Sequence, residues 1–442
     1  MKRLVTPAVW LVIASAGTMA RGQSAPGSTI GTRTTSVGEA VAVALRQNPD
    51  ALSSEAAVSG AQASRAEVRG NFFPRLHVDA NLQQWNSPFD LAFGPATFRV
   101  REAFTWTFTP SIVQPLTPLW AIYDQYKVQD YGVDVATLKR QVTRRDIAYR
   151  VVESYYRLLE AQRLAEVADT SVSQLEAQQR EAQSLFDNGV IGKNDLLRAG
   201  LALASARQRS IQTRGNVVLA RGQIETLMGN SPDAAFEPVP FSGEPPPVDD
   251  ATLQSAEGRA VGQRLEVRAL ERTIAQADAG VAFAKKKLLP QVNAVGNYTH
   301  FEGSAFQQAD AAYVGLFASW DVWDWGTTTS GITQANAKLD QARFARKKIE
   351  DEVRLEARQA FVNAQTAKEA LGVARTAVSQ AEENYRIVTK KFEASAATSF
   401  DVVDAESLLT QSRAQVENAL YDYLIARAAL ERATGDALPG EK

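Results

Sequence analysis

The side chains that carry most enzyme and metal chemistry are scarce in this sequence. It contains no cysteine and only two histidines, His77 and His300, so thiolate zinc sites and disulfides are excluded and the usual transition-metal ligands are nearly absent. The glycine-containing stretch GVIGK at 189–193 is too short for a phosphate-binding loop. No serine-, cysteine- or metal-based catalytic motif is present either. The sequence therefore predicts neither an enzyme nor a bound cofactor.

Two aspartates, Asp401 and Asp404, form the most suggestive acidic pair. They stand three residues apart where a long helix is expected to begin, so both carboxylates lie on one face of that helix. Acidic side chains are favoured at helix N-termini because they complement the helix dipole and accept hydrogen bonds from free backbone amides. Taken alone, the pair indicates helix capping.

Long helices are the main elements that must position such residues. From about Ala136 to Phe186 there is no proline or glycine, and apolar residues recur at steps of three and four. At ~1.5 Å per residue, ~50 helical residues span about 75 Å. Residues 350–393 repeat this pattern with one interruption at Gly372. Helices of this length predict coiled-coil-like packing, with chain reversals in the small, polar stretches 187–193 and 394–399.

The chain contains an internal repeat. Residues 61–76 resemble residues 277–292, with Pro74 matching Pro290 at a shift of 290 − 74 = 216. Residues 185–197 resemble residues 391–403, with Asp195 matching Asp401 at a shift of 401 − 195 = 206. The first copy is thus ten residues longer between these landmarks, 216 − 206 = 10, and loops between strands tolerate such differences best.

A proline-rich stretch separates the two copies. Six of the 17 prolines fall in it, so it cannot be regular helix and is predicted to be an extended linker. The predicted division of the chain is a first repeat at 36–230, a linker at 231–250, a second repeat at 251–435 and a C-terminal tail at 436–442.

Each repeat also carries two candidate strands, at about 75–85 and 99–109 and at about 291–301 and 311–320. Their alternation of apolar and polar residues, with aromatics toward the ends, is typical of transmembrane β-barrels, although an amphipathic sheet on a soluble core shows the same alternation. Known barrels have ~8 strands or more, and an open edge in lipid leaves backbone groups unpaired. A membrane-spanning form must therefore oligomerise, with two copies giving eight strands and three giving twelve.

Composition and the N-terminus bear on location. Residues 1–22 combine a basic start, an apolar run and small residues, which predicts a secretory signal peptide rather than a membrane anchor. The net charge is −2 and the pI about 6.0, which argues against nucleic acid as a partner. The mature chain is expected outside the cytoplasm, either soluble or crossing a membrane as strands.

Taken together, these features resemble the TolC-like outer-membrane efflux proteins. The resemblance covers about residues 36–435 and rests first on the order of the elements. A proline stands at each helix-to-strand junction (FFP and LLP), and VQPL follows the second strand at 113–116. Two related segments complete it, LFDNGVIGKNDLLRA at 185–199 and YRIVTKKFEASAATSFDVVDAE at 385–406. It implies a mainly α fold with a transmembrane β part: a homotrimer whose twelve-stranded barrel in the outer membrane continues into a periplasmic α-helical barrel.

The same resemblance implies the function. It describes a passive exit duct of a tripartite efflux or type I secretion system, which passes small toxic molecules or secreted proteins. The partners would be an inner-membrane pump, a periplasmic adaptor protein and outer-membrane lipid, and no cofactor is implied. The alternative is a soluble periplasmic coiled-coil protein without pore activity.

The resemblance also assigns roles to residues near the helix reversals. Asp401 and Asp404 match aspartates of the family's pore constriction, where six carboxylates would favour cations and raise one another's pKa. Asp195 matches a gate residue that pairs with an arginine, but the arginine position here is Ala397. Phe392 matches a packing residue of the same gate. The candidate substitutes for the missing arginine are Lys193, Lys390 and Lys391.

Two further sets of residues follow from the resemblance. Adaptor docking is expected at the reversals, where exposed apolar residues suit a partner, although internal packing of the tip explains them equally well. These positions are Gly189, Val190, Ile191, Gly192, Ser395, Ala396, Ala397 and Thr398. Contact with lipid is expected for the strand aromatics Phe104, Trp106, Phe108, Tyr298 and Trp320.

Overall fold

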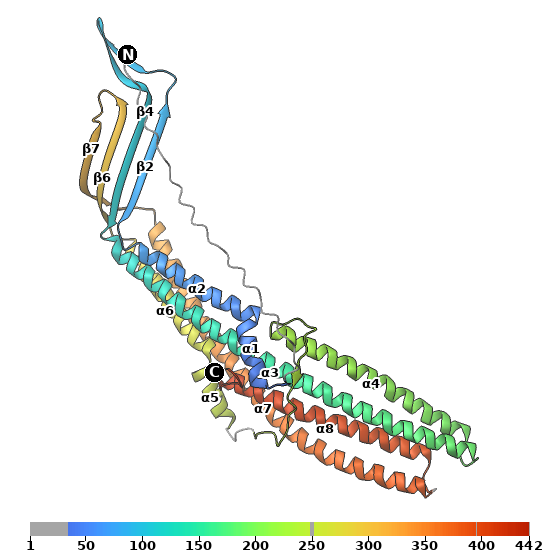
Figure 1. Cartoon of the computed structure of the whole chain (residues 1–442). Coiled ribbons are helices and arrows are strands. Elements are labelled where there is room, and N and C mark those ends of the chain that lie inside the picture. The colour runs from blue at the N-terminus through green and yellow to red at the C-terminus, as the bar shows by residue number, and fades with distance from the viewer. Residues whose placement is uncertain (1–33, 248–251, 395, 442) are drawn as a thin grey trace.

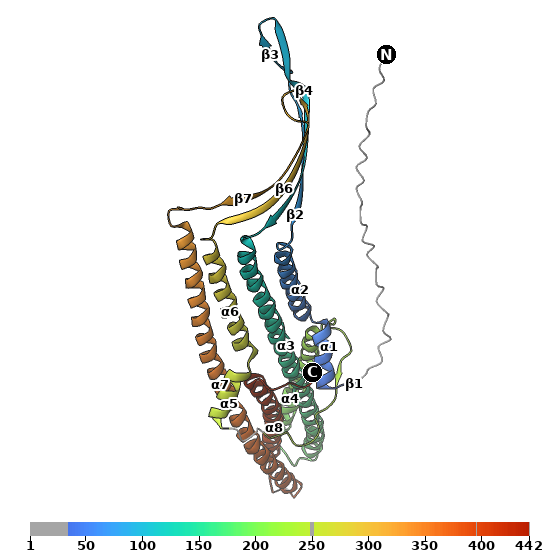
Figure 2. The same ribbon diagram turned by 90° about the vertical axis from the view of Figure 1, so that its left-hand side faces the viewer.

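The protein is an elongated molecule with a curved sheet at one end and long helices running away from it (Figures 1 and 2). The structure is a computed structural model and describes residues 34–247, 252–394 and 396–441. The expected signal peptide at 1–22 lies outside the described residues. None of the helices in the described ranges combines the length and apolar character that a membrane-spanning helix requires.

The four predicted strands are present and pair in one antiparallel sheet with the order β2-β4-β6-β7. The predicted strand at 99–109 is too short: pairing with β2 and β6 extends it at its C-terminal end to Pro115, and pairing with a further strand extends it at its N-terminal end to Ala96. The segment expected to be a loop in the first hairpin contains a further strand, β3, which pairs with the start of β4. Thus β3 accounts for much of the extra length of the first repeat. The strands are β2 Arg75–Gln84, β3 Phe89–Phe93, β4 Ala96–Pro115, β6 Gln291–Ser304 and β7 Asp310–Ser319.

The register of the sheet separates its two faces. Trp106 lies opposite Leu82 on β2 and Glu302 on β6, and Tyr298 lies opposite Ala312 on β7. Because residues directly opposite share a face, the alternating apolar residues of all four strands gather on one side. Large side chains on that face are exposed, among them Leu76, Leu82, Phe104, Ile112, Val314 and Leu316. The outer edges of β2 and β7 pair with no strand among the described residues.

Two helices, α3 and α7, run the full length of the helical body (Figure 2). The 70-residue α3 is longer than the predicted helix and starts at Pro118, since proline fits the first turn of a helix. The helix continues through Gly132, where a side chain would come within 3.1 Å of the Gln276 amide nitrogen on α6, so close packing of the two helices favours glycine there. The expected interruption at Gly372 is also absent, and α7 continues through it. The two helices are α3 Pro118–Asp187 and α7 Thr327–Glu393.

Shorter helices pack along these two. On the sheet side, α2 packs on α3, and α6 lies between α3 and α7. On the distal side α4 packs on α3 and α8 on α7, and α3 also contacts α8. The two smallest helices, α1 and α5, lie near the middle of the body (Figure 1). Their bounds are α1 Val37–Gln47, α2 Pro49–Gly70, α4 Lys193–Leu227, α5 Leu253–Gln263, α6 Leu265–Lys286 and α8 Ser399–Thr434.

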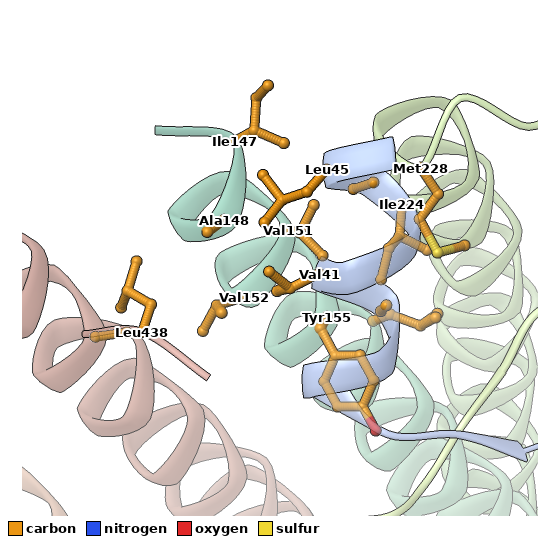
Figure 3. Packing of buried hydrophobic residues seen from close by; sticks show 14 of the residues in the cluster. Val41, Leu45, Ile147, Ala148, Val151, Val152, Tyr155, Ile224, Met228 and Leu438 are labelled. Carbon is orange, nitrogen blue, oxygen red and sulfur yellow. The ribbon is translucent and has the colours of Figure 1, made fainter. Parts of the chain in front are cut away.

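The main hydrophobic core lies where the two repeats meet. Side chains of α1, α3, α4 and α8 pack there, including Val41, Val151 and Ile224 (Figure 3). The expected tail is part of this core: Leu438 is buried, and the Glu441 carboxylate lies 3.0 Å from Arg145 on α3. The proline-rich linker begins here as well, with the two-residue strand β5 (Glu237–Pro238) pairing with β1 (Thr34–Thr35).

Candidate functional site: the tips of the helical hairpins

The end of the molecule opposite the sheet consists of two helical hairpins, α3 with α4 and α7 with α8 (Figure 1). Each hairpin reverses in a short turn, so each has a tip, at 188–192 and at 394–398. The hairpins touch each other through α8, which packs against both α3 and α4. The predicted constriction, gate and docking residues that the structure describes lie on or beside these tips.

The first tip is closed by a glycine in the left-handed region. Gly189 has φ +73, and its amide donates to the Phe186 carbonyl at 2.9 Å. The adjacent Val190 is 63% exposed, whereas Ile191 is half-buried. Gly192 then precedes α4 without a side-chain cap. Val190 is thus available to a partner, and Ile191 partly packs within the tip.

The second tip ends in a capping box at the start of α8. The Thr398 backbone amide donates to Asp401 Oδ2 at 2.8 Å, and the Asp401 amide donates to Thr398 Oγ1 at 3.3 Å. The bond from the Thr398 backbone amide, with a further bond from the Thr398 hydroxyl, lowers the pKa of Asp401. Asp401 therefore caps its helix, as acidic pairs at helix starts commonly do. Ala396 and Thr398 are exposed and Ala397 is half-buried; Ser395 lies outside the described residues.

Asp404 lies one turn into α8 and is exposed, like Asp401. The neighbouring Val402 and Ala405 are buried against the other helices. The two carboxylates therefore share the solvent-facing side of α8, and neither forms an ion pair with a described residue. A pore lined by this side of α8 would present both.

The predicted gate residues are not joined in this chain. Asp195 is half-buried in the first turn of α4 and forms no ion pair within the described ranges. Phe392 is 8% exposed and packs inside its own chain at the end of α7. The arginine position is Ala397, and none of the expected substitutes replaces its ion pair in the part of the chain that the structure describes. Those substitutes are Lys193, Lys390 and Lys391.

Two contacts between the hairpins were not predicted. The guanidinium carbon of Arg198 on α4 lies 5.3 Å from the centre of the Phe400 ring on α8. Deeper in the body, the buried Glu406 carboxylate on α8 accepts a hydrogen bond from the Ser171 hydroxyl on α3 at 2.6 Å. A signal for the second contact existed, because Val402, Glu406 and Leu409 follow the helical spacing of a buried stripe.

The predicted aromatics of the sheet share one face but are not equivalent. Phe104 and Phe108 are exposed, whereas Trp106 is half-buried and its indole donates to Glu302. Tyr298 donates to Asp310, and the Trp320 indole donates to the Leu288 carbonyl at 3.1 Å just beyond β7. Each of these polar bonds lies toward an end of the sheet, and the centre of the face is apolar.

Comparison with known proteins identifies a matching family and structures of similar fold. The sequence profile of a family described as outer membrane efflux protein matches residues 40–230 and 258–436. Outer membrane efflux protein BepC of Brucella suis is 21% identical over 290 residues, which cover 65% of this chain and 62% of that protein, less than two thirds of its length. Alkaline protease secretion protein AprF of Pseudomonas aeruginosa is 22% identical over 378 residues, 83% of this chain and 77% of that protein. The solved outer-membrane channel OprN is 20% identical and superposes with a TM-score of 0.78 over 91% of this chain and 90% of that chain.

Proposed function

The chain belongs to the outer membrane efflux protein family, and from this premise we propose that it forms the passive outer-membrane duct of a tripartite efflux or type I secretion system. The observation that carries the proposal is the continuity of an amphipathic sheet with long helical hairpins. The sheet exposes apolar side chains on one face and has two unpaired edges among the described residues. Such a sheet is stable in lipid only when its edges are paired.

Three copies satisfy this requirement. The edge of β7 in one copy would pair with the edge of β2 in the next, and three four-stranded sheets would close as twelve strands. The apolar face with Phe104, Phe108 and Leu316 would then contact lipid. The opposite face carries His77, Asn81 and Thr107, which suit a water-filled interior. The helices of the three copies would continue the duct into the periplasm.

At the distal end, three copies of α8 would bring Asp401 and Asp404 around the axis as a constriction. Two adjacent rings of three carboxylates, about 4.5 Å apart along α8, favour the passage of cations. The hairpin tips, with the exposed Val190, would receive a periplasmic adaptor, and an inner-membrane pump would supply energy and choose the cargo. The relatives named for efflux and for protease secretion support both cargo classes, small toxic molecules and secreted proteins.

Planar-bilayer recording of the purified protein, together with cell fractionation, tests the proposal. Detergent-extracted protein should insert as trimers and give discrete, cation-selective conductance steps. Recovery in the soluble periplasmic fraction without detergent, and no conductance in bilayers, would show instead a soluble coiled-coil protein without pore activity.

A further inference from the structure

Glu406 is a buried carboxylate that pairs with no cation among the described residues. It is 4% exposed, and its Oε1 atom accepts hydrogen bonds from Ser171 Oγ at 2.6 Å and from Thr410 Oγ1 at 2.7 Å. Both hydroxyl side chains are buried as well. Burying a carboxylate is costly unless hydrogen bonds compensate it, and bonds to a charged acceptor are stronger than neutral ones. The two hydroxyls are therefore what stabilises this charge in the interior.

The bond to Ser171 joins the two repeats in the distal part of the helical body. Ser171 lies on α3 of the first repeat and Glu406 on α8 of the second, two residues after the exposed Asp404. Among the described residues, no other hydrogen bond between the two hairpins lies nearer to the tips. A small apolar cluster joins α3, α4 and α8: Leu175, Leu203 and Ala206 are buried, and Val172, Ala202 and Val403 pack on them. The bond thus helps to fix the position of the first turns of α8 relative to α3.

The internal repeat shows that this bond is not a general feature of the helix packing. At the shift of 206 that aligns the tips, Glu406 corresponds to Gly200 and Ser171 to Ala377. Neither counterpart has a polar side chain, so the repeat-related contact cannot form. Of the two repeat-related positions, only the one on α8 carries a carboxylate, and it lies where the second hairpin packs on the first.

Stability alone does not explain a glutamate here. Replacing a buried charge by an apolar residue of similar volume is often neutral or stabilising. The carboxylate differs from an apolar side chain in the separated state: water solvates it once the helices part, whereas an apolar side chain would be exposed unfavourably. A glutamate at this position therefore bonds the two hairpins while they are packed together, and it is well solvated once they have separated.

We propose that Glu406 is a latch residue that holds the second hairpin against the first, and so positions Asp401 and Asp404 in the closed constriction. The latch rests on the proposed channel function. Opening of the distal end breaks the bond to Ser171 and leaves the bond to Thr410 intact, because Thr410 lies on the same helix as Glu406. Glu406 thus acts through the position of other residues rather than by contacting the cargo.

Single-channel recording of three variants in planar bilayers tests the latch. Ser171→Ala removes the bond between the hairpins and should raise the open-to-closed ratio roughly tenfold or more, the change expected for the loss of one bond to a charged group. Thr410→Val is the matched control, because it removes the bond within α8 and should change this ratio much less. Glu406→Gln keeps an oxygen acceptor for both hydroxyls but loses the charge, so it should weaken the bond to Ser171 and raise the ratio less than Ser171→Ala does.

Ion selectivity separates positioning from general destabilisation. In Ser171→Ala the cation preference should fall although no charge has been removed, since the carboxylates of the constriction move apart. A merely structural role would lower the yield of trimers and leave the ratio and selectivity of assembled channels unchanged. If Glu406→Gln opened the channel as much as Ser171→Ala, the charge rather than the bond would matter and the latch would be wrong. If the parent protein did not conduct, the channel proposal itself would fail.

Discussion

Arg198 on α4 and Phe400 on α8 meet between the two hairpins near their tips, with the guanidinium carbon 5.3 Å from the ring centre. A guanidinium over an aromatic face is an attractive cation–π arrangement. The contact lies at the tips, where the ion pair expected from the family resemblance is absent because its arginine position is Ala397. An arginine is thus still present at the junction of the hairpins, on a different helix and with an aromatic partner.

Phe400→Ala should therefore weaken the closed state of the tips. A cation–π contact at an exposed site contributes about 0.5–1 kcal/mol, which corresponds to a change of about two- to fivefold in the open-to-closed ratio. Single-channel recording measures this ratio. Phe344→Ala is the matched control, because Phe344 is an exposed phenylalanine of α7 outside the hairpin junction. Equal effects of the two variants would contradict a role for the Arg198 contact.

The double variant Asp401→Asn with Asp404→Asn should lower the cation preference of the channel. Both side chains keep their size and their oxygen acceptors, so the capping of α8 is largely retained while up to six charges of the trimer are removed. Reversal potentials under a salt gradient measure the change. Asp351→Asn, at an exposed position of α7, is the control and should have no effect. An unchanged reversal potential in the double variant would exclude the carboxylate ring.

The pH dependence of that selectivity should respond to Thr398. Hydrogen bonds from Thr398 lower the pKa of Asp401, so the charge and the capping it provides are present above the usual aspartate pKa and are lost as the pH falls through the lowered value. Thr398→Ala removes the hydroxyl and keeps the backbone amide. Titration of the reversal potential should then show selectivity lost at a higher pH than in the parent protein. If the pH midpoint of the selectivity loss in Thr398→Ala were the same as in the parent protein, or lower, the conclusion that Thr398 lowers the pKa of Asp401 would be contradicted.

The core between the repeats should be sensitive to alkali through Tyr155. Its buried hydroxyl donates to the Val239 carbonyl at 2.9 Å, and burial raises its pKa to about 12. An unfolded tyrosine ionises near pH ~10, so the stability that depends on this residue is complete below ~10 and is lost between ~10 and about 12. Tyr155→Phe should cost about 1 kcal/mol at neutral pH and reduce the alkaline loss.

Thermal unfolding in detergent at several pH values measures both effects of the Tyr155 change. Tyr123→Phe, at an exposed tyrosine, is the control and should follow the parent protein throughout. If the stability of Tyr155→Phe fell between pH ~10 and about 12 as much as that of the parent protein, Tyr155 would not be the cause of the loss of stability in alkali.

Arg264 should be the most costly arginine to replace among those discussed. It is 4% exposed and lies 2.8 Å from Glu266 and 3.0 Å from Glu356, at the junction of α5 and α6 with α7. Replacing Arg264 leaves Glu266 and Glu356 without this partner, but both carboxylates are partly exposed and Glu356 keeps its pair with Arg432, so the expected cost is about 1–3 kcal/mol. Arg264→Met should therefore lower the thermal stability strongly. Arg354→Met, whose pair with Asp351 is exposed, should cost less than about 1 kcal/mol, and comparable losses would contradict the argument.

Local patterns in the sequence predicted the elements well because their causes are local. The alternation around Trp106 and the three- and four-residue spacing around Val151 follow from the geometry of strands and helices. The capping of α8 by Asp401 was also predicted, from the position of an acidic pair at the expected helix start, and the structure adds Thr398 as its capping partner. The strand β3 was missed because it is defined by its pairing with β4 rather than by a pattern of its own.

The sequence by itself determined the repeat, the order of helices and strands, and which faces are apolar, because each depends on neighbours within a few residues along the chain. The tertiary structure alone decided that Glu406 is buried against Ser171, 235 positions away, and that Arg198 meets Phe400. It also showed that Asp195 forms no ion pair in the described part of the chain. Pairing between distant residues depends on how whole helices pack, and no local spacing encodes it.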